Sequence, residues 1–412
     1  MRLADYRPVM GPRILLATTV VWPSAARLAS AFAAVGADVE AVFPDGHMIA
    51  GSRYLAAAHR YTPLLPLFSF SRAVGRAAPD LIVPCDDRAV ALLLQLAGRG
   101  GATGAVIARS LGRLGAYPEL IGRSAFIRAA RAAGIRAPQT VALAGEHQLD
   151  AELARLGFPA VLKADGSHGG DGVAVVRNRA QAQQAFRRLS AAGSRLRNLV
   201  RAFTRKDIHF LHDAAVPQAV SISLQSFVPG QPATTAFACW KGRVLAAIHM
   251  DVLETLGSTG PASVMRRVDC PDMDQAAIRV AERFGLSGLH GLDFVRDPSG
   301  KAHLIEINPR ATQASPLALG PGRDLAAALA GCVFPAGARP LLTQNPVIAL
   351  FPQEWRRNPQ SDWLKSAYLD APWDDPAVLK ACLEPAEPVP PRPAALAERP
   401  VLVPEGVRAS TH

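Results

Sequence analysis

The segment LHGLDFVRDPSGKAHLIEINPRA, residues 289–311, decides the fold of this chain. Two runs in which apolar and polar residues alternate flank the sequence Asp-Pro-Ser-Gly at positions 297–300, and this arrangement is typical of a β-hairpin. If these four residues form the loop, Asp293 on the first strand lies opposite Leu304 on the second. The segment therefore predicts an antiparallel pair of strands with a defined register.

The expected hairpin gathers oxygen-bearing side chains on one face. Because successive side chains of a strand point to opposite faces, Asp293, Glu306 and Asn308 are expected to lie together. The reverse face would carry Phe294, Ile305 and Ile307. Carboxylate and amide oxygens are the ligands that Mg²⁺ prefers, and a small number of them leaves room for phosphate oxygens. The alternative is an ordinary solvated face on which Glu306 pairs with Arg310.

A second signal is a glycine-rich loop earlier in the chain. Lys163 lies near the end of the apolar strand PAVLKA, and ADGSHGGDG follows it at residues 164–172. A charge at the end of a buried strand is costly unless it meets an anion, and glycines allow backbone N–H groups to close over phosphate. The loop is not a GxxxxGK[ST] motif, because the lysine precedes the glycines. A phosphate site is the prediction, and a flexible surface loop is the alternative.

The first part of the chain alternates strand and helix patterns. Apolar runs indicate strands at 13–21, 37–43 and 80–87, and helices are expected at 24–36 and 89–98. This alternation predicts an open α/β unit. No GxGxxG sequence follows the first strand, so a dinucleotide site is not expected there.

Two later elements connect this unit to the motifs. The sequence ELIGRSAFIRAARAA predicts one helix over residues 119–133, which Gly134 ends. A second hairpin is expected to turn at Lys241-Gly242.

Composition limits the class of protein. The 412 residues are 49% hydrophobic and 19% charged, which is typical of a soluble globular protein with two or three domains. The net charge of +11 is carried mostly by arginine and is a weak indication of nucleic-acid binding. Five cysteines without a CxxC pair indicate neither a disulfide framework nor a cysteine metal site, which favours a reducing cytoplasm.

No run approaches the roughly 18 consecutive apolar residues of a membrane helix. The apolar run at 14–22 imitates a short secretory signal, but a buried first strand explains it as well. We therefore expect a cytoplasmic protein with no membrane and no nucleic-acid partner.

The order of the motifs resembles the ATP-grasp superfamily of the carboxylate–amine ligase type, with its carbamoyl-phosphate-synthase-like and amino-acid-ligase-like members. The resemblance spans about residues 115–315 and is most specific at IEINPRA, residues 305–311. It implies an α/β and α+β fold, in which an N-terminal open α/β (pre-ATP-grasp) domain precedes a two-lobed ATP-grasp fold. The implied divisions are 1–115 for the N-terminal domain, 116–335 for the ATP-grasp domain with a small central lobe at about 136–230, 336–384 for a C-terminal segment and 385–412 for a Pro-rich tail.

The resemblance also implies roles for individual residues. Family members bind their metal through a signature that here supplies Asp293, Glu306 and Asn308, and Arg310 would be catalytic by stabilising charge on the transferring phosphoryl group. A family strand of QEYIPG type meets the adenine, and the matching sequence is QSFVPG at 225–230. The implied ATP-binding residues are Arg123, Lys163, Gly169, Gly170, Gly172, Gln225, Ser226, Val228 and Gln231.

Three positions depart from the family pattern. Arg123 stands where lysine is usual, Ser226 replaces a glutamate of the adenine strand, and Gln231 stands where a glutamate usually holds the ribose. These departures keep a second hypothesis open, which is a non-catalytic ATP-binding regulatory protein of the same fold.

The first hypothesis is a ligase that uses ATP and Mg²⁺ (or Mn²⁺) to form an acyl phosphate from a small carboxylate, such as an amino acid. The acyl phosphate would then join an amine or a similar nucleophile. Small-molecule carboxylate and amine substrates would be the partners, and a homodimer is compatible with the family.

Overall fold

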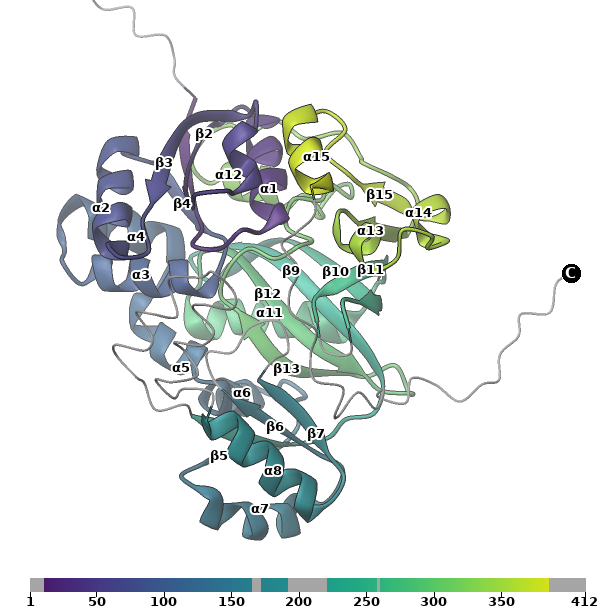
Figure 1. Cartoon of the computed structure of the whole chain (residues 1–412). Coiled ribbons are helices and arrows are strands. Elements are labelled where there is room, and N and C mark those ends of the chain that lie inside the picture. Colours follow the sequence, from purple (N-terminus) through teal and green to yellow (C-terminus); the bar gives the residue numbers. More distant parts are fainter. Residues whose placement is uncertain (1–10, 165–171, 192–220, 258–259, 385–412) are drawn as a thin grey trace, which may run out of the picture.

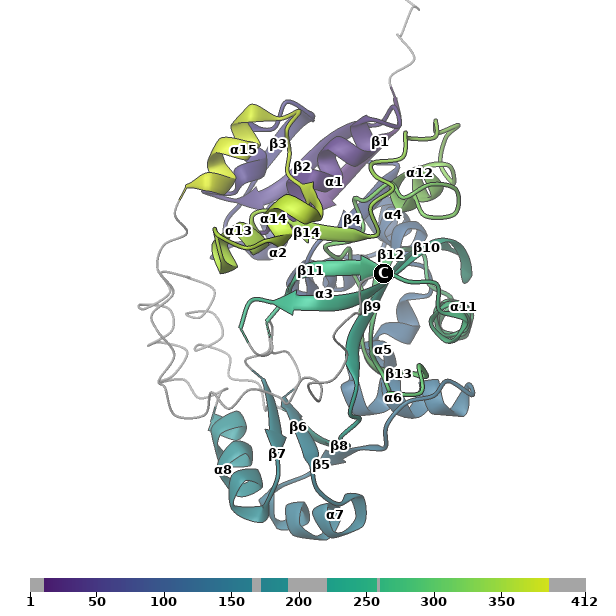
Figure 2. The same cartoon turned by 90° about the vertical axis from the view of Figure 1, so that its right-hand side faces the viewer.

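The computed structural model describes residues 11–164, 172–191, 221–257 and 260–384, which are built around three β-sheets (Figure 1). One four-stranded sheet lies at one end of the molecule, a second lies at the opposite end, and a seven-stranded sheet lies between them. The view turned by 90° shows the same order (Figure 2). This mixed architecture of helices and several sheets confirms the predicted fold class. The Pro-rich tail at 385–412 and most of the glycine loop lie outside the described residues.

The N-terminal sheet is parallel, with the strand order β3-β2-β1-β4. Because β2 and β4 lie on opposite sides of β1, the strand order reverses between β1 and β4. The carboxyl ends of two such strands are a usual ligand position in open α/β sheets. The strands are β1 (Arg13–Ala17), β2 (Asp38–Pro44), β3 (Leu55–Tyr61) and β4 (Leu81–Pro84), and the helices are α1 (Pro23–Ala33), α2 (Pro66–Ala77), α3 (Asp87–Ala97) and α4 (Gly101–Leu111).

The small sheet is antiparallel and has the order β5-β8-β6-β7. Helices α7 (Leu149–Leu156) and α8 (Arg179–Ser190) pack against it and close a hydrophobic core of their own. Its strands are β5 (Thr140–Leu143), β6 (Ala160–Ala164), β7 (Val173–Val176) and β8 (Ile222–Ser226).

The large sheet has the order β13-β12-β9-β10-β11-β14-β15 and is antiparallel except for its last pair. The hairpin of β9 and β10 turns at Lys241 and Gly242, as predicted, and both residues have positive φ, 50° and 82°, as a two-residue hairpin turn requires. The strands are β9 (Gln231–Trp240), β10 (Arg243–Thr255), β11 (Ala262–Arg267), β12 (Gly288–Arg296), β13 (Ala302–Asn308), β14 (Val347–Leu350) and β15 (Tyr368–Asp370).

The remaining helices of the described chain have between three and fourteen residues. They are η1 (Met48–Gly51), η2 (Leu114–Ala116), α5 (Tyr117–Ile121), α6 (Arg123–Ala132), η3 (Glu146–Gln148), α11 (Pro271–Phe284), α12 (Leu325–Ala330), α13 (Gln353–Arg357), α14 (Trp363–Ser366) and α15 (Pro376–Leu383).

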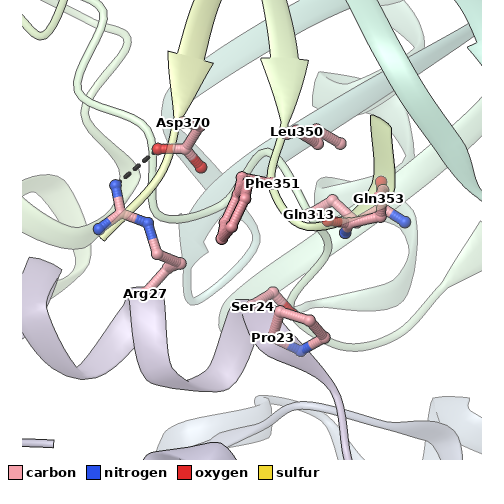
Figure 3. Close-up of a pocket in the computed structure, with 8 residues that line it drawn as sticks. All are labelled: Pro23, Ser24, Arg27, Gln313, Leu350, Phe351, Gln353 and Asp370. Atoms are coloured by element: carbon pink, nitrogen blue, oxygen red, sulfur yellow. Dashed lines mark hydrogen bonds and ion pairs between the residues drawn. The ribbon is translucent and has the colours of Figure 1, made fainter. Parts of the chain in front are cut away.

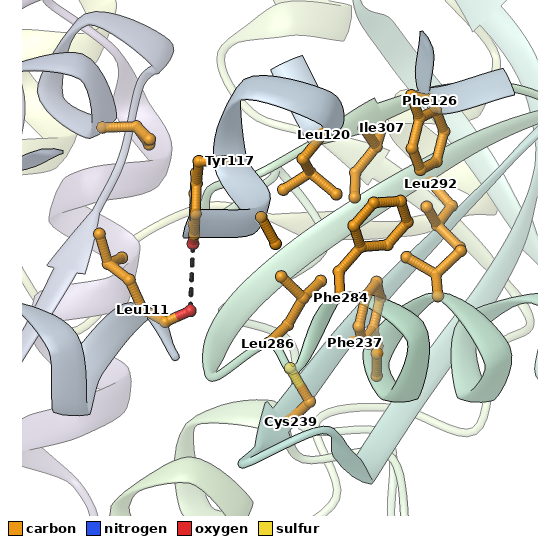
Figure 4. Close-up of a cluster of buried hydrophobic side chains, with 14 of the residues drawn as sticks. Leu111, Tyr117, Leu120, Phe126, Phe237, Cys239, Phe284, Leu286, Leu292 and Ile307 are labelled. Atoms are coloured by element: carbon orange, nitrogen blue, oxygen red, sulfur yellow. Dashed lines mark hydrogen bonds between the residues drawn. The ribbon is translucent and has the colours of Figure 1, made fainter. Parts of the chain in front are cut away.

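Two further cores join the N-terminal unit to the large sheet. In the first, Tyr117 is fully buried among side chains of the large sheet and of α11, and its hydroxyl donates to the carbonyl of Leu111 at 3.2 Å (Figure 4). The second combines α1 with α12, with β14 and with Val378 and Cys382 of α15. The buried side chains of the small lobe belong to neither of these cores.

The register of the 289–311 hairpin differs from the prediction. Asp293 lies opposite Glu306 instead of Leu304, because a β-bulge between Asp293 and Phe294 accommodates an extra residue, Ile305, on the second strand. The loop is also one residue longer than expected, since Arg296 pairs with Ala302 instead of Lys301, and this shift adds to that of the bulge. The predicted shared face of the acidic residues is unaffected.

The helix predicted over residues 119–133 is two helices, α5 and α6. Gly122 lies directly between the last residue of α5 and the first residue of α6. Its backbone is extended, with φ −72° and ψ 107°. Glycine is a poor helix former, so the break needs little free energy. The break places Arg123 at the first position of α6.

Candidate active site

The predicted acidic face lies on β12 and β13, and hydrogen bonds hold its side chains in place. Asp293 accepts a hydrogen bond from the Thr234 hydroxyl at 2.9 Å and another from the Asn308 amide at 2.9 Å. Glu306 is the direct cross-strand neighbour of Asp293. The structure thus brings together the three residues for which a metal role was predicted.

Burial raises the pKa of Asp293, and the nearby Glu306 carboxylate raises it further. Two carboxylates that face each other across a strand pair repel, so a cation between them would be favourable. Among the described residues, no group of three or more histidine, cysteine, aspartate or glutamate side chains is arranged to hold a metal ion. A cation here would therefore need the Asn308 amide oxygen and ligands from a bound molecule.

Lys163 crosses from the small lobe to the large sheet. Its side chain is 5% exposed, and its ammonium donates to the carbonyl of Ile305 on β13 at 3.4 Å. Burial lowers the pKa of Lys163 to about 8; the neighbouring Arg123 charge also lowers it, while the Glu306 and Asp293 carboxylates act in the opposite direction. The lysine thus lies in the same charge cluster as the acidic pair.

Arg123 enters the cluster from the first turn of α6. Its guanidinium forms an ion pair with Glu306 at 3.0 Å, and its side chain is largely buried. In this structure the arginine that departs from the family pattern contacts a carboxylate of the acidic face.

Arg310 follows β13 and connects the acidic face to the N-terminal unit. It donates to the Asn308 amide oxygen at 3.1 Å, and its Nε lies 3.2 Å from the Asp87 carboxylate at the start of α3. Asp87 was not a predicted site residue. The sequence could have indicated it, because Asp87 lies at the carboxyl end of a buried strand. Ligands of open α/β sheets bind at the carboxyl ends of the strands.

Asp86, the neighbour of Asp87, has a structural role. Its carboxylate accepts from the Thr19 N–H at 2.6 Å and from the Ala89 N–H at 2.8 Å, so it caps α3 and joins the ends of β1 and β4. This cap fixes the helix turn from which Asp87 reaches Arg310.

The QSFVPG segment links the small lobe to the large sheet. Gln225 lies in β8 between β5 and β6, and its side-chain amide donates to Thr140 at 2.9 Å. The Ser226 N–H donates to the Gln139 carbonyl at 2.9 Å. Within the part of the chain that the structure describes, no acceptor is found for the N–H groups of Phe227, Val228 and Gly230, so these backbone donors could meet a ligand.

The remaining predicted nucleotide residues are placed as follows. The Gln231 side chain donates to the Val252 carbonyl of β10, so it is engaged within the large sheet. Gly172 accepts from the Ala164 N–H at 2.8 Å and thereby closes the glycine loop directly beside Lys163. Gly169 and Gly170 lie outside the described residues. The nucleotide role of all these residues stays a prediction.

Comparisons with known proteins agree with this arrangement. Residues 125–314 match the family model described as the ATP-grasp domain. A biotin carboxylase from Campylobacter jejuni has 15% identity and a TM-score of 0.56, with 81% of this chain and 72% of that chain covered. An L-amino acid ligase from Bacillus licheniformis has 13% identity and a TM-score of 0.56, with 80% and 76% covered.

An N5-carboxyaminoimidazole synthetase from Staphylococcus aureus, complexed with ADP, has 11% identity and a TM-score of 0.56, with 78% of each chain covered. A search of curated proteins finds no match. Residues 125–314 therefore form an ATP-grasp domain, which confirms the resemblance seen in the motifs. None of the described helices is both long and apolar enough to cross a membrane.

Proposed function

We propose that this protein is an ATP- and Mg²⁺-dependent ligase that joins a small carboxylate to an amine through an acyl phosphate. The observation that carries the proposal is the contact of Lys163, from the small lobe, with the strand that bears Glu306 and Asn308. A phosphate chain between the two lobes would meet a buried cation on one side and an acidic face on the other. This combination positions a triphosphate and a divalent cation together.

The donor set fits a magnesium ion. Asp293, Glu306 and the Asn308 amide supply hard oxygen ligands, and burial together with the Glu306 carboxylate raises the pKa of Asp293, so a bound cation would favour its charged form. These three residues would hold Mg²⁺, which would supply positive charge to neutralise the phosphates of a bound nucleotide. The solved relatives include structures described as complexed with ADP and with MgADP, which supports ATP and Mg²⁺ as the reactants.

The proposed reaction has two steps. A carboxylate oxygen of the substrate attacks the γ-phosphorus of ATP, the new O–P bond forms, and the bond to the β-phosphate oxygen breaks to release ADP. The amine then attacks the acyl carbon, the C–N bond forms, phosphate leaves with one former carboxylate oxygen, and the amine loses a proton. Lys163 and Arg310 would stabilise charge on the transferring group, and the lobes would exclude water from the acyl phosphate.

A regulatory ATP-binding protein is the alternative. It is favoured by the Arg123–Glu306 ion pair and by the engagement of Gln231 with Val252, since both occupy groups that a nucleotide site would use. The intact set of Asp293, Glu306, Asn308 and Arg310 favours the ligase.

ADP release from MgATP, measured with amino acids and small carboxylates alone and in pairs, separates the two functions. A ligase gives ADP with at least one pair, and Glu306→Gln abolishes that release while the protein stays folded. If nucleotide binds and no pair releases ADP, the ligase proposal is wrong. A homodimer and a cytoplasmic location stay predictions.

A further inference from the structure

Glu306 of the acidic face is paired with a cation from the same chain. The Arg123 guanidinium lies 3.0 Å from a carboxylate oxygen of Glu306, and the two side chains are 12% and 27% exposed. Glu306 is also the direct cross-strand neighbour of Asp293. A carboxylate for which a metal role is predicted is therefore held by an arginine.

The stability of helix α6 does not explain the position of this arginine. Arg123 is the first residue of α6, which has no acidic residue in its first turn and no side-chain cap. The helix dipole disfavours a positive charge at this end of a helix. Phe126 and Ile127 of α6 share a core with Ile307 of β13, so the helix is anchored beside the acidic face. The favourable interaction of Arg123 is therefore the one with the Glu306 carboxylate.

Charges of opposite sign are balanced in this cluster. Asp293 and Glu306 supply two carboxylates, and Arg123 and Lys163 supply two cations. Arg310 has its own carboxylate partner on α3. A divalent cation that entered alone would leave two excess positive charges, and a nucleoside diphosphate alone would leave an excess of negative charge. The two ligands together come closest to neutrality.

A guanidinium can exchange a carboxylate for a phosphate. Its planar set of N–H donors matches the oxygen atoms of both groups. Rotation about the side-chain bonds of Arg123 moves the guanidinium without a change in α6. Because a diphosphate carries more negative charge than one carboxylate, a nucleotide between the lobes would compete with Glu306 for the arginine.

We propose that Arg123 is an internal counter-ion of Glu306 that transfers to the phosphates when a metal–nucleotide complex binds. Without nucleotide, Arg123 occupies Glu306 and repels a divalent cation from the acidic face. When the phosphates take the guanidinium, Glu306 becomes available to the metal. The proposal rests on the function proposed above, because it concerns the same ATP and Mg²⁺ site, but it requires binding and no turnover.

The test measures two affinities of the full chain. Electron spin resonance measures Mn²⁺ binding without nucleotide, and calorimetry measures MgADP binding. In Arg123→Gln the affinity for Mn²⁺ should rise at least about tenfold, because the repulsion by a nearby guanidinium is removed. The affinity for MgADP should fall about tenfold, because charge-assisted hydrogen bonds to phosphate are lost. An arginine with a merely structural role would not move the two affinities in opposite directions.

Two further variants identify the cause of the change. Arg123→Lys keeps the positive charge, so its affinity for Mn²⁺ should stay as low as that of the unmodified protein. Glu306→Gln added to Arg123→Gln should remove the gain in Mn²⁺ affinity, because the released carboxylate is then absent. A gain that persists in the double variant would place Mn²⁺ elsewhere and overturn the proposal.

Arg27 provides the matched control for effects of folding. Its guanidinium donates to Asp370 at 2.6 Å beside the small pocket between α1 and β15 (Figure 3). Its side chain is 13% exposed, compared with 12% for Arg123, and its ion pair includes no residue of the acidic face. Arg27→Gln should lower Tm and leave both affinities unchanged. An equal gain in Mn²⁺ affinity in Arg27→Gln would show that lost stability is the cause, and the proposal would be wrong.

A measurement on the unmodified protein covers the case in which Arg123→Gln does not fold. The side-chain NMR signals of Arg123, assigned by their loss in Arg123→Lys, should shift on addition of MgADP and stay unchanged with Mg²⁺ alone. A shift with Mg²⁺ alone, or none with MgADP, would contradict the transfer of the guanidinium.

The two proposals can fail separately. If the unmodified protein does not bind MgADP, both are wrong. If MgADP binds and Arg123→Gln leaves the affinity for Mn²⁺ unchanged, or leaves the affinity for MgADP unchanged or higher, the role of Arg123 is wrong and the proposed function stands. If both affinities change as expected and no substrate pair releases ADP, the ligase function is wrong and the role of Arg123 stands.

Discussion

Lys163 lies where its charge is disfavoured until an anion arrives. Because burial lowers its pKa to about 8, the ammonium form dominates below pH 8 and the neutral amine dominates above it. A bound phosphate favours the ammonium, so binding above pH 8 requires uptake of a proton. Affinity for MgADP should therefore fall as pH rises, by about fivefold between pH 8 and pH 9.

Titration calorimetry at pH 7, 8 and 9 with constant Mg²⁺ measures this dependence. Lys163→Arg is the control, since arginine keeps its charge throughout this range and its profile should be flat. A flat profile in the unmodified protein would show that Lys163 does not meet the phosphates.

Asp87 is a positioning residue for Arg310. Its carboxylate lies 3.2 Å from the arginine Nε, and Arg310 in turn donates to Asn308 on the acidic face. Asp87→Asn should lower kcat for ADP release about tenfold, equivalent to ~1.4 kcal/mol, with little change in the KM for ATP. The loss of an acidic residue from the first turn of α3 should cost only about 0.3–1 kcal/mol of stability.

Asp87→Glu tests this reading, because it restores the charge and should recover part of kcat. If Asp87→Glu and Asp87→Asn are equally slow, or if kcat falls only in proportion to the folded fraction, Asp87 has a merely structural role.

At the scale of elements, the connection between the two lobes depends on Gly230. It has φ 152°, and an added Cβ would lie 2.1 Å from the carbonyl oxygen of Arg296. Gly230→Ala should therefore destabilise the protein by about 3 kcal/mol or more, because strain and overlap add.

Gly300 is the matched control in the neighbouring hairpin turn. It has φ 82° with open space around the Cβ position, so Gly300→Ala should cost only about 1–2 kcal/mol. Chemical denaturation of both variants measures the difference. Equal losses would show that the close approach of Gly230 to β12 is unimportant.

The elements also show what a sequence can and cannot specify. The shared face of Asp293, Glu306 and Asn308 was predictable, because side-chain alternation holds along each strand. The register was not, because Leu304 and Ile305 are both apolar and nothing in the local pattern shows which of them is the extra residue of the bulge. Likewise, periodicity alone does not show that the chain breaks at Gly122 between α5 and α6.

Other contacts could not be predicted because they join distant segments. Arg27 meets Asp370, and Arg310 meets Asp87, through the folding of the N-terminal unit onto the rest of the chain. A single sequence carries no record of such pairings. The motif order identified the ATP-grasp domain because its signals are each local.

In the whole molecule, the hydrophobic cores group the parts of the chain differently from the sequence motifs. The N-terminal unit, the large sheet and the C-terminal segment share two cores, and the small lobe has a separate core. Hydrogen exchange should therefore show two cooperative units, with the amides of β5, β6 and β8 exchanging faster than those of β9 and β12.

MgADP should slow exchange in the small lobe most, because Lys163 and Val228 would then contact ligand. Uniform protection in the free protein, or an effect of MgADP confined to the N-terminal sheet, would contradict this division.

In the proposed reaction, a substrate carboxylate becomes an acyl phosphate. The most direct measurement uses a carboxylate labelled with ¹⁸O in the pair that releases ADP, followed by mass analysis of the phosphate formed. We predict that one ¹⁸O per turnover appears in inorganic phosphate, because the carboxylate oxygen that attacks the γ-phosphorus leaves with it. Unlabelled phosphate, or label found in AMP, would contradict an acyl phosphate intermediate.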